Sequence, residues 1–320
     1  MGTVAATGTL QVSPGRTTTY RLTATGAGTT TTATATVTVD NPFTLTIVSP
    51  TDGQVIQRPD VLVRGSFANS AGRETGITVN GITALQYVNE FMANHVPLVQ
   101  GENSITVTAT DTDGRAYSQS VMVTAQITGQ HCTATVIPEA SLDPYEGELR
   151  IAAPTELRRS EVLAYGWGAV TYGQGPPDFY PLTIDGPGLY RLTVEATARD
   201  GRIFTDETAV LVYDRDQLDA LLQAKWNAMK ERLAAGDVPG AVKHYANGTK
   251  GDYETIFTSI GSQLPQIAQQ MGPIQMIVAK DGSAKFRLKR SEVHQGQTYE
   301  ITYPIYFITE ENGLWKIERF

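Results

Sequence analysis

Three aromatic residues in a glycine-rich segment are the side chains most suited to binding a ligand. Tyr165 and Trp167 flank Gly166, and Tyr172 follows them. Exposed aromatic rings on loops contact sugars or peptides, because each ring offers a large apolar face. The alternative is that Trp167 fills the core of its own domain, as a tryptophan on a central strand does. Two interpretations therefore stay open. In one, Tyr165, Trp167 and Tyr172 contact a protein or glycan; in the other, Trp167 is a structural residue of the core.

The run Asp111-Thr112-Asp113-Gly114 begins like a calcium-binding loop. An EF-hand needs Glu at its twelfth position, and that position is Met122 here, so this loop is excluded. Aspartate and glycine are also the ordinary residues of a hairpin turn, which is the interpretation we favour. Calcium at a junction between modules, with Asp40 or Asn41 as a ligand, is the alternative. Apart from that calcium, we expect no cofactor.

The single cysteine, Cys132, cannot form an intrachain disulfide. It lies in a stretch of alternating polar and apolar residues, which predicts a half-buried strand position. A nucleophilic cysteine needs a base beside it, whereas the adjacent His131 is expected on the opposite face of the strand. The sequence also lacks zinc-ligand spacing, a phosphate-binding loop and a Gly-x-Ser-x-Gly turn. These absences predict no metal site and no catalytic residue.

A second group of candidates lies near the C-terminus: His244, Tyr245, Tyr253, Tyr303 and Tyr306. They would line a pocket if this segment folds around one. Proton transfer also needs an acid or base in an apolar position, and no Asp or Glu occupies such a position. His244 is explained more simply by a helix end, where the dipole favours it. Tyr303 and Tyr306 have opposite parity along one strand, so one of them faces solvent and could contact a partner.

Charge and composition exclude several classes of function. The net charge is −8 and no basic cluster occurs, so we expect no nucleic-acid partner. The apolar runs are only as long as strands, so we expect no membrane span. No charged segment followed by an apolar one opens the chain, so we expect no signal peptide in it. Only 18% of the residues are charged, and the abundant threonine suits exposed strand faces.

The elements that position these side chains follow a repeat. Similar strand phrases occupy 20–25, 105–110 and 190–197, and each runs into a glycine-containing turn and a second alternating segment. The copies are about 85 residues apart, which is the size of one small β-sandwich and too long for a solenoid repeat. The sequence therefore predicts sandwiches in tandem.

Residues 1–40 hold fewer strands than a sandwich needs. We expect about three there, against the roughly seven of a complete sandwich. The predicted strands are 9–12, 18–25 and 32–39, with turns at Ser13-Pro14-Gly15 and Gly26-Ala27-Gly28. We interpret 1–40 as the C-terminal half of an Ig-like module. The expected partners then include neighbouring modules of a longer parent chain.

Residues 43–128 and 131–213 predict two complete sandwiches. The first opens with Ser49-Pro50-Thr51-Asp52-Gly53, carries Val79-Asn80-Gly81 and continues with Gly-Glu-Asn-x-Ile-x-Val-x-Ala-x-Asp over 101–111. These residues resemble the bacterial immunoglobulin-like modules of large secreted and surface proteins. The resemblance implies an Ig-like fold and does not specify a function. The second sandwich is rich in proline at first and closes with a hairpin that repeats the earlier phrase.

Residues 216–320 change in pattern. A helical face starts at Asp214 or Asp216 as N-cap and ends at Gly236. Its apolar positions, spaced at 3.6 residues, are Leu218, Leu221, Leu222, Trp226, Met229 and Leu233. A second helix capped by Asp237 and a third over 253–271, interrupted near Gly261 and Pro265, follow. Four strands at 274–279, 284–289, 299–309 and 313–320 close the chain. Helices followed by an antiparallel meander predict an α+β domain.

The ending of the chain carries a second resemblance. Ile305-Tyr306-Phe307-Ile308 and Glu311-Asn312-Gly313-Leu314-Trp315-Lys316-Ile317 resemble the NTF2-like (cystatin-like) superfamily, over 217–320. The resemblance implies a helix packed in the concave face of a curved sheet. It also implies a cone that holds an acid or base and a tyrosine in the enzymes of that superfamily.

The fold class that follows is multidomain: Ig-like β-sandwiches in tandem and a C-terminal α+β domain with helices on a curved antiparallel sheet. The leading hypothesis is a non-catalytic, extracellular or cell-surface structural and adhesion protein, in which an Ig-like stalk carries the α+β domain. The short linker Asp40-Asn41-Pro42 would restrict the angle between modules. The alternatives are a carbohydrate-binding accessory region of a secreted glycan-active protein and a pocket enzyme in the NTF2-like domain.

Overall fold

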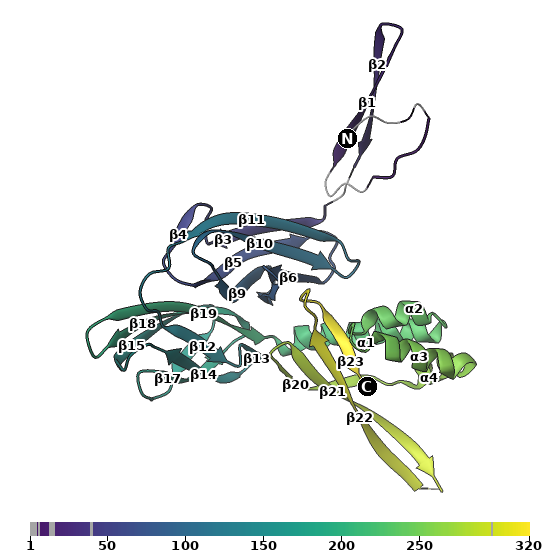
Figure 1. The fold of residues 1–320 in the computed structure, drawn as a ribbon. Helices are drawn as coiled ribbons and strands as arrows, with labels where there is room; N and C mark the ends of the chain where they lie inside the picture. Colours follow the sequence, from purple (N-terminus) through teal and green to yellow (C-terminus); the bar gives the residue numbers. More distant parts are fainter. Residues whose placement is uncertain (1–4, 6, 13–16, 39–40, 296) are drawn as a thin grey trace. The chain divides into compact units, whose positions relative to one another are not determined.

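The computed structural model describes residues 5, 7–12, 17–38, 41–295 and 297–320, and the chain separates into two compact units, Met1–Phe43 and Thr44–Phe320 (Figure 1). In the first unit, β1 (Thr18–Gly26) and β2 (Thr29–Val37) pair as an antiparallel hairpin. Ala27 and Gly28 form its turn with φ of 48° and 81°. Positive φ at both positions is the type I′ geometry that matches strand twist.

The hairpin of the first unit has no buried residue of its own, since every side chain in it is exposed or half-buried. The prediction of a strand over 9–12 is wrong, because those residues form none. A short alternating segment needs a neighbouring strand for its backbone hydrogen bonds, and none pairs with this one. The predicted turn at Ser13-Pro14-Gly15 and the linker residue Asp40 lie outside the described residues.

The first sandwich of the second unit consists of two antiparallel sheets with one parallel edge pair. One sheet has the order β4-β11-β10-β6-β7 and the other β3-β5-β9-β8. Their bounds are β3 Phe43–Ser49, β4 Gln54–Ile56, β5 Asp60–Asn69, β6 Thr75–Val79, β7 Ile82–Thr83, β8 Leu85–Tyr87, β9 Glu90–Pro97, β10 Gly101–Asp111 and β11 Ala116–Ala125. Alternate residues of β10 are buried, including Ile105 and Val107. Asn80 and Gly81 adopt positive φ, so the expected hairpin turn is confirmed.

The second sandwich packs the sheet β12-β14-β17-β16 against β15, β18 and β19. Their bounds are β12 Thr133–Ile137, β13 Ala140–Leu142, β14 Tyr145–Ala152, β15 Leu157–Tyr165, β16 Ala169–Tyr172, β17 Phe179–Asp185, β18 Gly188–Ala198 and β19 Ile203–Tyr213. Two long strands, β18 and β19, form the closing hairpin that the repeated phrase predicts. The two sandwiches therefore have the predicted Ig-like, all-β character.

One sheet runs from the second sandwich into the C-terminal domain. Its order is β15-β18-β19-β13 followed by β20 (Ile274–Lys280), β21 (Ser283–His294), β22 (Gln297–Thr309) and β23 (Trp315–Arg319). Ser141 in β13 pairs with Lys280 in β20. The Asp281 backbone N–H donates to Ala140 O at 2.9 Å, and the Ala140 N–H donates to Asp281 Oδ1 at 3.1 Å. The domains at 131–213 and 216–320 are thus joined by backbone pairing, which the separate sequence patterns did not indicate.

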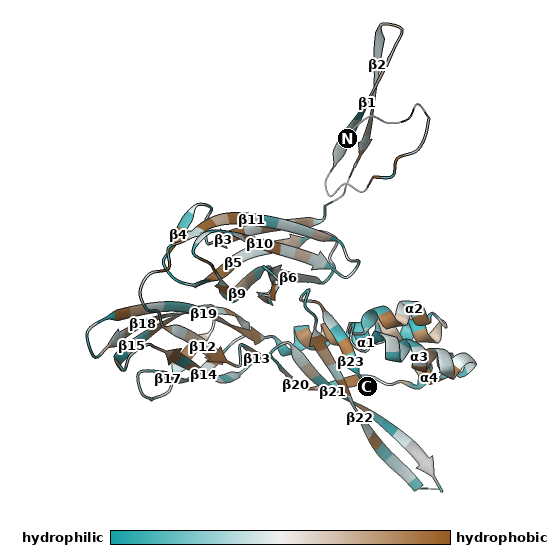
Figure 2. Cartoon of the chain, in the orientation of Figure 1, coloured by the Kyte–Doolittle hydropathy of each residue, from teal (hydrophilic) through white to brown (hydrophobic). Residues whose placement is uncertain are grey.

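The C-terminal domain is α+β, as predicted. Asp214 caps α1 (Arg215–Ala234) by accepting hydrogen bonds from the backbone of Asp216 and Gln217, and Gly236 follows the helix with φ of 72°. The other elements are α2 Val238–Ala241, η1 Val242–His244, α3 Lys250–Ile260, η2 Gly261–Gln263, α4 Leu264–Gln270, β20 Ile274–Lys280, β21 Ser283–His294, β22 Gln297–Thr309 and β23 Trp315–Arg319. Hydrophobic residues (brown in Figure 2) concentrate where β20 to β23 pass the helices.

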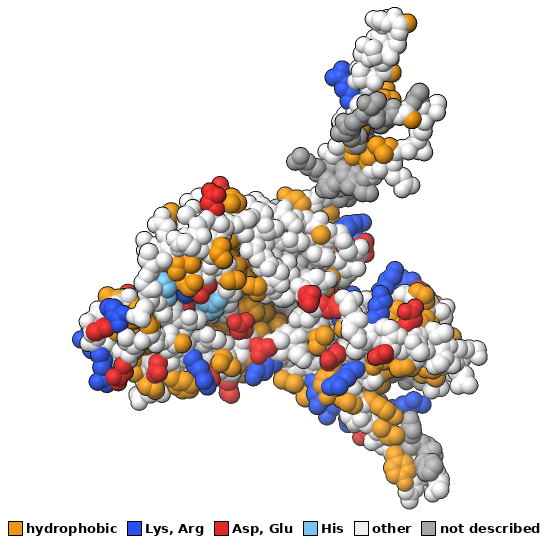
Figure 3. Space-filling view, in the orientation of Figure 1, with side chains coloured by type: hydrophobic (Ala, Val, Ile, Leu, Met, Phe, Trp, Pro, Cys, Tyr) orange, Lys and Arg blue, Asp and Glu red, His pale blue; other side chains and the backbone are white. Residues whose placement is uncertain are grey.

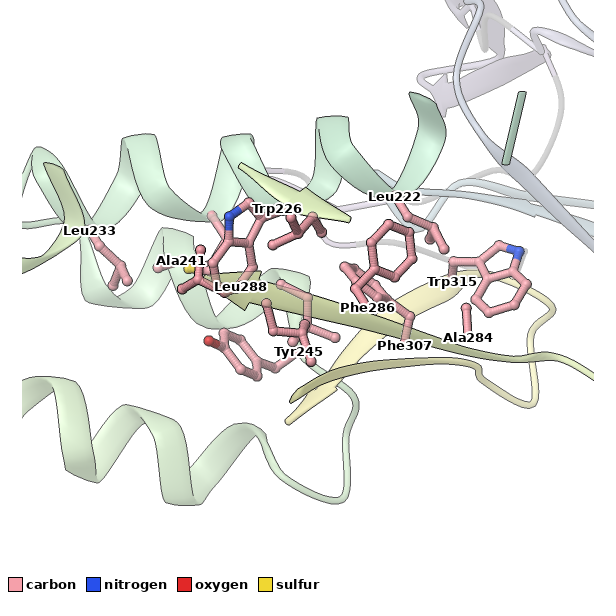
Figure 4. Close-up of a cluster of buried hydrophobic side chains, with 14 of the residues drawn as sticks. Leu222, Trp226, Leu233, Ala241, Tyr245, Ala284, Phe286, Leu288, Phe307 and Trp315 are labelled. Atoms are coloured by element: carbon pink, nitrogen blue, oxygen red, sulfur yellow. The ribbon is translucent and has the colours of Figure 1, made fainter. Parts of the chain in front are cut away.

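The apolar face of α1 forms the core of this domain. Its buried residues are Leu218, Leu222, Trp226, Met229 and Leu233, and they share one cluster with Phe286, Ile305 and Phe307 of the sheet (Figure 4). Trp226 is fully buried, its Nε1 donates to Gly272 O at 3.1 Å, and its ring meets Phe320 edge-on at 5.1 Å. The predicted packing of α1 on the sheet is confirmed, and side chains fill the space between the two layers.

Trp226→Ala is expected to lower the free energy of unfolding by about 3–5 kcal/mol, because it opens a cavity and removes a hydrogen bond at the centre of this core. Trp167→Ala is the matched control: that side chain is 93% exposed, and its loss should change stability by no more than about 0.5 kcal/mol. Denaturant unfolding followed by circular dichroism measures both. A cost for Trp226→Ala below about 1 kcal/mol would contradict the packing described here.

Candidate functional site

Trp167 lies in the connection between β15 and β16 and is 93% exposed, so the interpretation as a core tryptophan is wrong. The reason lies in its two glycine neighbours. A Cβ at Gly166 would lie 2.1 Å from Tyr190 Cδ1, and one at Gly168 would lie 2.3 Å from the Tyr190 hydroxyl oxygen. The backbone therefore lies directly on Tyr190, which occupies the core in place of the tryptophan. The indole of Trp167 extends into solvent.

Tyr165 is exposed at the end of β15, and the Arg191 guanidinium lies over its ring, 4.4 Å from the centroid. Leu163 has the same parity on this strand and is also exposed. Arg191 is held in turn by Glu207, with an Nη1–Oε1 distance of 2.8 Å. We call Leu163, Tyr165 and Trp167 the aromatic edge. It combines apolar area with a fixed cation, which are the features of a surface that contacts sugars or polar peptides.

The other two candidate contacts do not belong to the aromatic edge. Tyr172 is half-buried against the sandwich core, meets Tyr180 edge-on at 6.1 Å, and burial raises its pKa to about 12. Its hydroxyl is buried without a hydrogen-bond partner in the described part of the chain. Tyr303 is exposed, as the parity argument allows, but it lies on β22, and five strands of the shared sheet separate it from β15.

The possible catalytic groups lie in different surroundings. Cys132 is fully buried just before β12, so its predicted half-buried strand position is wrong, and burial raises its pKa to about 11. Tyr245 is buried against Tyr253 at 4.2 Å, and burial raises its pKa. Tyr306 instead lies under the Arg319 guanidinium at 4.5 Å. These tyrosines fill or cover the core.

The Asp111 turn is a hairpin turn closed by a side chain. Asp111 is buried, and its Oδ1 accepts from the backbone N–H of Asp113 at 2.9 Å and of Arg115 at 3.0 Å. Arg73 binds the Asp113 carboxylate at 2.7 Å. Over the described residues, no three His, Cys, Asp or Glu side chains are placed to hold a metal ion. Nor does any described helix have the length and apolar character of a membrane span.

A polar cluster that the local sequence patterns did not indicate joins the two sandwiches. Asp206 of β19 is 4% exposed. Its carboxylate binds Arg58 at 2.5 Å and His95 Nε2 at 3.2 Å, both from the first sandwich, and accepts the Ala134 N–H at 2.6 Å. Arg58 also binds Asp60 at 2.7 Å. We call Arg58, Asp60, His95 and Asp206 the Asp206 cluster.

A β-bulge directs two first-sandwich residues into this interface. Val61 pairs with Val96 and Val63 with Ala93, so Asn94 and His95 together oppose a single residue of β5. A bulge of this kind changes the direction of the side chains on it. His95 adopts φ of 47°, which is unusual for a residue with a Cβ.

Asn94 extends the interface by forming the two hydrogen bonds with β19 that the backbone of a neighbouring strand would form. Its Oδ1 accepts the Ala209 N–H at 2.7 Å and its Nδ2 donates to Ala209 O at 3.0 Å. The amide side chain therefore satisfies both backbone groups of one residue in β19. Apolar packing lies beside Asn94 in the same interface. Leu85, Tyr87 and Met92 of the first sandwich pack against Ala140, Leu189 and Leu211 of the second.

A second contact joins the first sandwich to the C-terminal domain. Glu74 forms an ion pair with Lys225 of α1, and its Oε1 accepts the Trp315 N–H at 2.9 Å. A Cβ at Gly76 would lie 2.0 Å from Asn312 O, so the two backbones touch where only glycine fits. We call Glu74, Lys225 and Trp315 the Glu74 contact. Direct contacts therefore join these two domains within Thr44–Phe320.

One signal could have indicated these contacts. Asp206 has the parity of the buried residues in β19, and aspartate is rarely buried unless it is paired. A charged residue at a buried parity therefore predicts a partner from another element. The identity of that partner depends on the approach of a distant strand, which the local pattern does not contain.

Comparison with known proteins supports the fold of one domain. The family model "Glucodextranase, domain B" matches residues 43–127, which is the first sandwich. No curated protein matches the chain.

Solved structures match at low similarity. They include Clostridium thermocellum CbhA fibronectin(III)-like modules, at 13% identity over 54% of this chain and 96% of that one, with a TM-score of 0.21. The human desmocollin-1 ectodomain matches at 14% over 57% and 40%, with a TM-score of 0.19. The titin I-band fragment I67–I69 matches at 11% over 55% and 67%, with a TM-score of 0.21. TM-scores of this size carry no argument about function.

Asp206→Asn is expected to lower the free energy of unfolding by about 3 kcal/mol, because Arg58 and His95 lose the charge that they face in a nearly buried site. The control is Glu207→Gln, the next residue, whose partly exposed ion pair with Arg191 should contribute less than about 1 kcal/mol. Urea unfolding compares the two variants. Equal costs would contradict the role of the Asp206 cluster.

His95 adds a dependence on pH. Its hydrogen bond to Asp206 is the largest influence on it and raises its pKa above 6.5, although burial opposes this. Because the folded pKa lies above the unfolded value, the stabilisation is complete below pH 6.5 and is lost as pH rises through the folded pKa. We expect His95→Gln to destabilise the protein more at about pH 6 than at about pH 9. A cost that is the same at both pH values would contradict this pairing.

Proposed function

We propose that this protein is a non-catalytic extracellular interaction protein, in which two Ig-like sandwiches and an α+β domain act as one rigid unit. The observation that carries the proposal is the Asp206 cluster, where a nearly buried carboxylate of one sandwich binds an arginine and a histidine of the other. Separating the sandwiches would part these side chains from their partners. It would also break the two hydrogen bonds between the Asn94 side chain and the Ala209 backbone. Such contacts favour one arrangement over a flexible string.

A rigid unit suits the presentation of a surface to a partner. Interfaces between domains of one chain are usually small, and the domains usually move relative to each other. Several buried polar contacts between the domains of this chain therefore favour a fixed arrangement. The match of the first sandwich to a glucodextranase domain and the low charge content support an extracellular, cell-surface setting. In this proposal the chain is the part of an adhesion or structural protein that holds its domains in register.

For 217–320 we propose an NTF2-like domain that serves as a cap and not as a pocket enzyme. The filled core supports this: Trp226, Phe286 and Phe307 occupy the space between α1 and the sheet. Burial raises the pKa of Tyr245, which makes it a poor proton donor or acceptor at neutral pH. The proposed cap would contact a partner through its surface.

The non-catalytic proposal predicts no turnover above background on a panel of glycosidase, esterase and isomerase substrates. The controls are His244→Gln and Tyr253→Phe, which remove the groups nearest to a proton-transfer role. Turnover by the unmodified chain that either substitution abolishes would contradict the proposal and favour the pocket enzyme.

A second candidate function is a carbohydrate-binding region of a secreted glycan-active protein. The observation that favours it is the aromatic edge, in which Trp167 is 93% exposed beside Tyr165 and its bound Arg191. Two glycines that pack on Tyr190 keep the Trp167 indole in solvent. Exposure of such a large apolar side chain is unfavourable unless a ligand or partner covers it. The name of the family model that matches 43–127 is consistent with a glycan-related setting.

This candidate predicts binding on a glycan array that falls at least about tenfold in Trp167→Ala, the size of effect of a contact residue. Tyr172→Phe is the matched control, because its hydroxyl is buried away from the aromatic edge and its loss should leave binding unchanged. Binding that survives Trp167→Ala, or no glycan binding at all, would reject this candidate and leave the interaction protein in place.

A further inference from the structure

The C-terminal half of the shared sheet packs one face on the helices and exposes the other. The buried residues of β21 belong to the core, so the residues that alternate with them point away from the helices. On β21 these residues are Lys285, Arg287 and Lys289. Figure 3 shows Lys and Arg side chains gathered over β20 and β21. The strand register adds Lys280 of β20 and Arg319 of β23 to this side, and we call these five residues the basic face.

Tyr306 lies among the cations of the basic face. Lys285 Nζ is 5.6 Å from the centroid of its ring, and the Arg319 guanidinium is 4.5 Å from it. Arg287 donates to Gln275 Oε1 at 2.8 Å. Within the described ranges, Lys285, Arg287 and Arg319 form no ion pair. An aromatic ring and an amide hold these three cations and leave their charge available to a partner.

Two carboxylates reduce the charge of the basic face without cancelling it. Glu300 binds Lys289 at 2.8 Å, and Lys289, together with a weaker effect of Arg287, lowers the pKa of Glu300. Glu318 lies in the bulge of β23 beside Arg319. With both carboxylates counted, the cations remain in excess, so this face attracts a negatively charged surface.

Two glutamates at the other end of the same sheet lie directly opposite each other. Glu161 of β15 pairs with Glu195 of β18 in the strand register, and both side chains are exposed. Like charges in this position destabilise a sheet. Neither carboxylate has an ion pair or a hydrogen bond in the described part of the chain. We call Glu161 and Glu195 the acidic face; it adjoins the aromatic edge, since Leu163 and Tyr165 follow Glu161 on the same side of β15.

The cations near the acidic face are held by other groups. Arg191 binds Glu207 at 2.8 Å, and Arg159 donates to Thr197 Oγ1 at 3.4 Å. Arg58 lines a hollow of about 500 Å³ beside the two glutamates, but it belongs to the Asp206 cluster and binds both carboxylates there. Of these three arginines, Arg159 is the one without a carboxylate partner. The acidic face therefore keeps a negative charge.

We propose that the basic face of one copy of this chain docks on the acidic face of a second copy. The two faces have opposite charge, which favours their encounter. Each also has exposed apolar side chains beside it, since Ile277 and Val278 of β20 are 45% and 46% exposed and the aromatic edge adjoins the acidic face. The inference rests on the proposed interaction protein and names its partner as the chain itself.

The contact joins the copies head to tail, because the two faces lie on opposite sides of the shared sheet. Glu195 points to the same side as Leu211 of β19, and Leu211 pairs with Ala140 of β13. Lys280 pairs with Ser141, the residue after Ala140, and therefore points to the other side. No single patch contains both faces, so a two-fold dimer cannot form this contact. A contact between different surfaces continues from copy to copy.

Sedimentation velocity of the full chain from about 10 to 500 µM tests the proposal. At low salt the mean mass should rise with concentration and pass that of a dimer. In about 0.5 M NaCl it should return to that of a monomer, because salt screens exposed charges. A monomer at all concentrations in low salt, or association that ends at a dimer, would overturn the proposal. A monomer whose three domains still tumble together would leave the proposed rigid unit intact.

Variants at the two faces locate the contact. Lys285→Glu with Arg287→Glu disables the basic face, and Glu161→Gln with Glu195→Gln disables the acidic face. Each pair of substitutions should weaken self-association at least about tenfold. A mixture of the two variants should form a complex of one copy of each and nothing larger, because each variant keeps the face that the other has lost.

The control is Asp252→Asn with Glu254→Gln, which removes two charges from α3, outside both faces. This variant should associate like the unmodified chain, and circular dichroism shows whether all three variants keep the native fold. Unchanged self-association in both face variants, or a mixture of the folded face variants that stays monomeric, would overturn the proposal.

Discussion

The arrangement of the second unit depends on one buried charge. Asp206 is almost fully buried on β19, a strand that also contributes to the core of its own sandwich, and its carboxylate cannot be left unpaired there without a large cost in free energy. Arg58 and His95 of the other sandwich supply the compensating charge. Because both come from outside its own domain, folding of the second sandwich and docking of the first are energetically linked.

The remaining contacts are consistent with that constraint. The bulge in β9 exists where Asn94 and His95 must reach β19, and Glu74 reaches α1 from the other end of the same sandwich. Gly76 permits the close approach of the Asn312 backbone there. The first sandwich is thereby fixed to both of its neighbours, while β13 and β20 join those neighbours to each other. We propose that these three pairwise contacts restrict the relative motion of the three domains.

The sequence was informative where structure depends on local pattern. The spacing of Leu218, Leu222 and Trp226 predicted the buried face of α1, and turn residues such as Asn80 and Gly81 predicted hairpins, because helix periodicity and positive φ are properties of neighbouring residues. It left Trp167 undecided between a core and an exposed position, since the packing of two glycines on Tyr190 determines its exposure. The partners of Asp206 could not be predicted, because they become its neighbours only after two domains dock.

The most direct test of this account is the rotational correlation time of each domain, measured by backbone 15N relaxation on the intact chain. If the Asp206 cluster and the Glu74 contact hold Thr44–Phe320 together, the two sandwiches and the α+β domain will share one correlation time, appropriate to a single body of their combined size. A shorter correlation time for the first sandwich than for the C-terminal domain would show independent motion and would contradict the central claim.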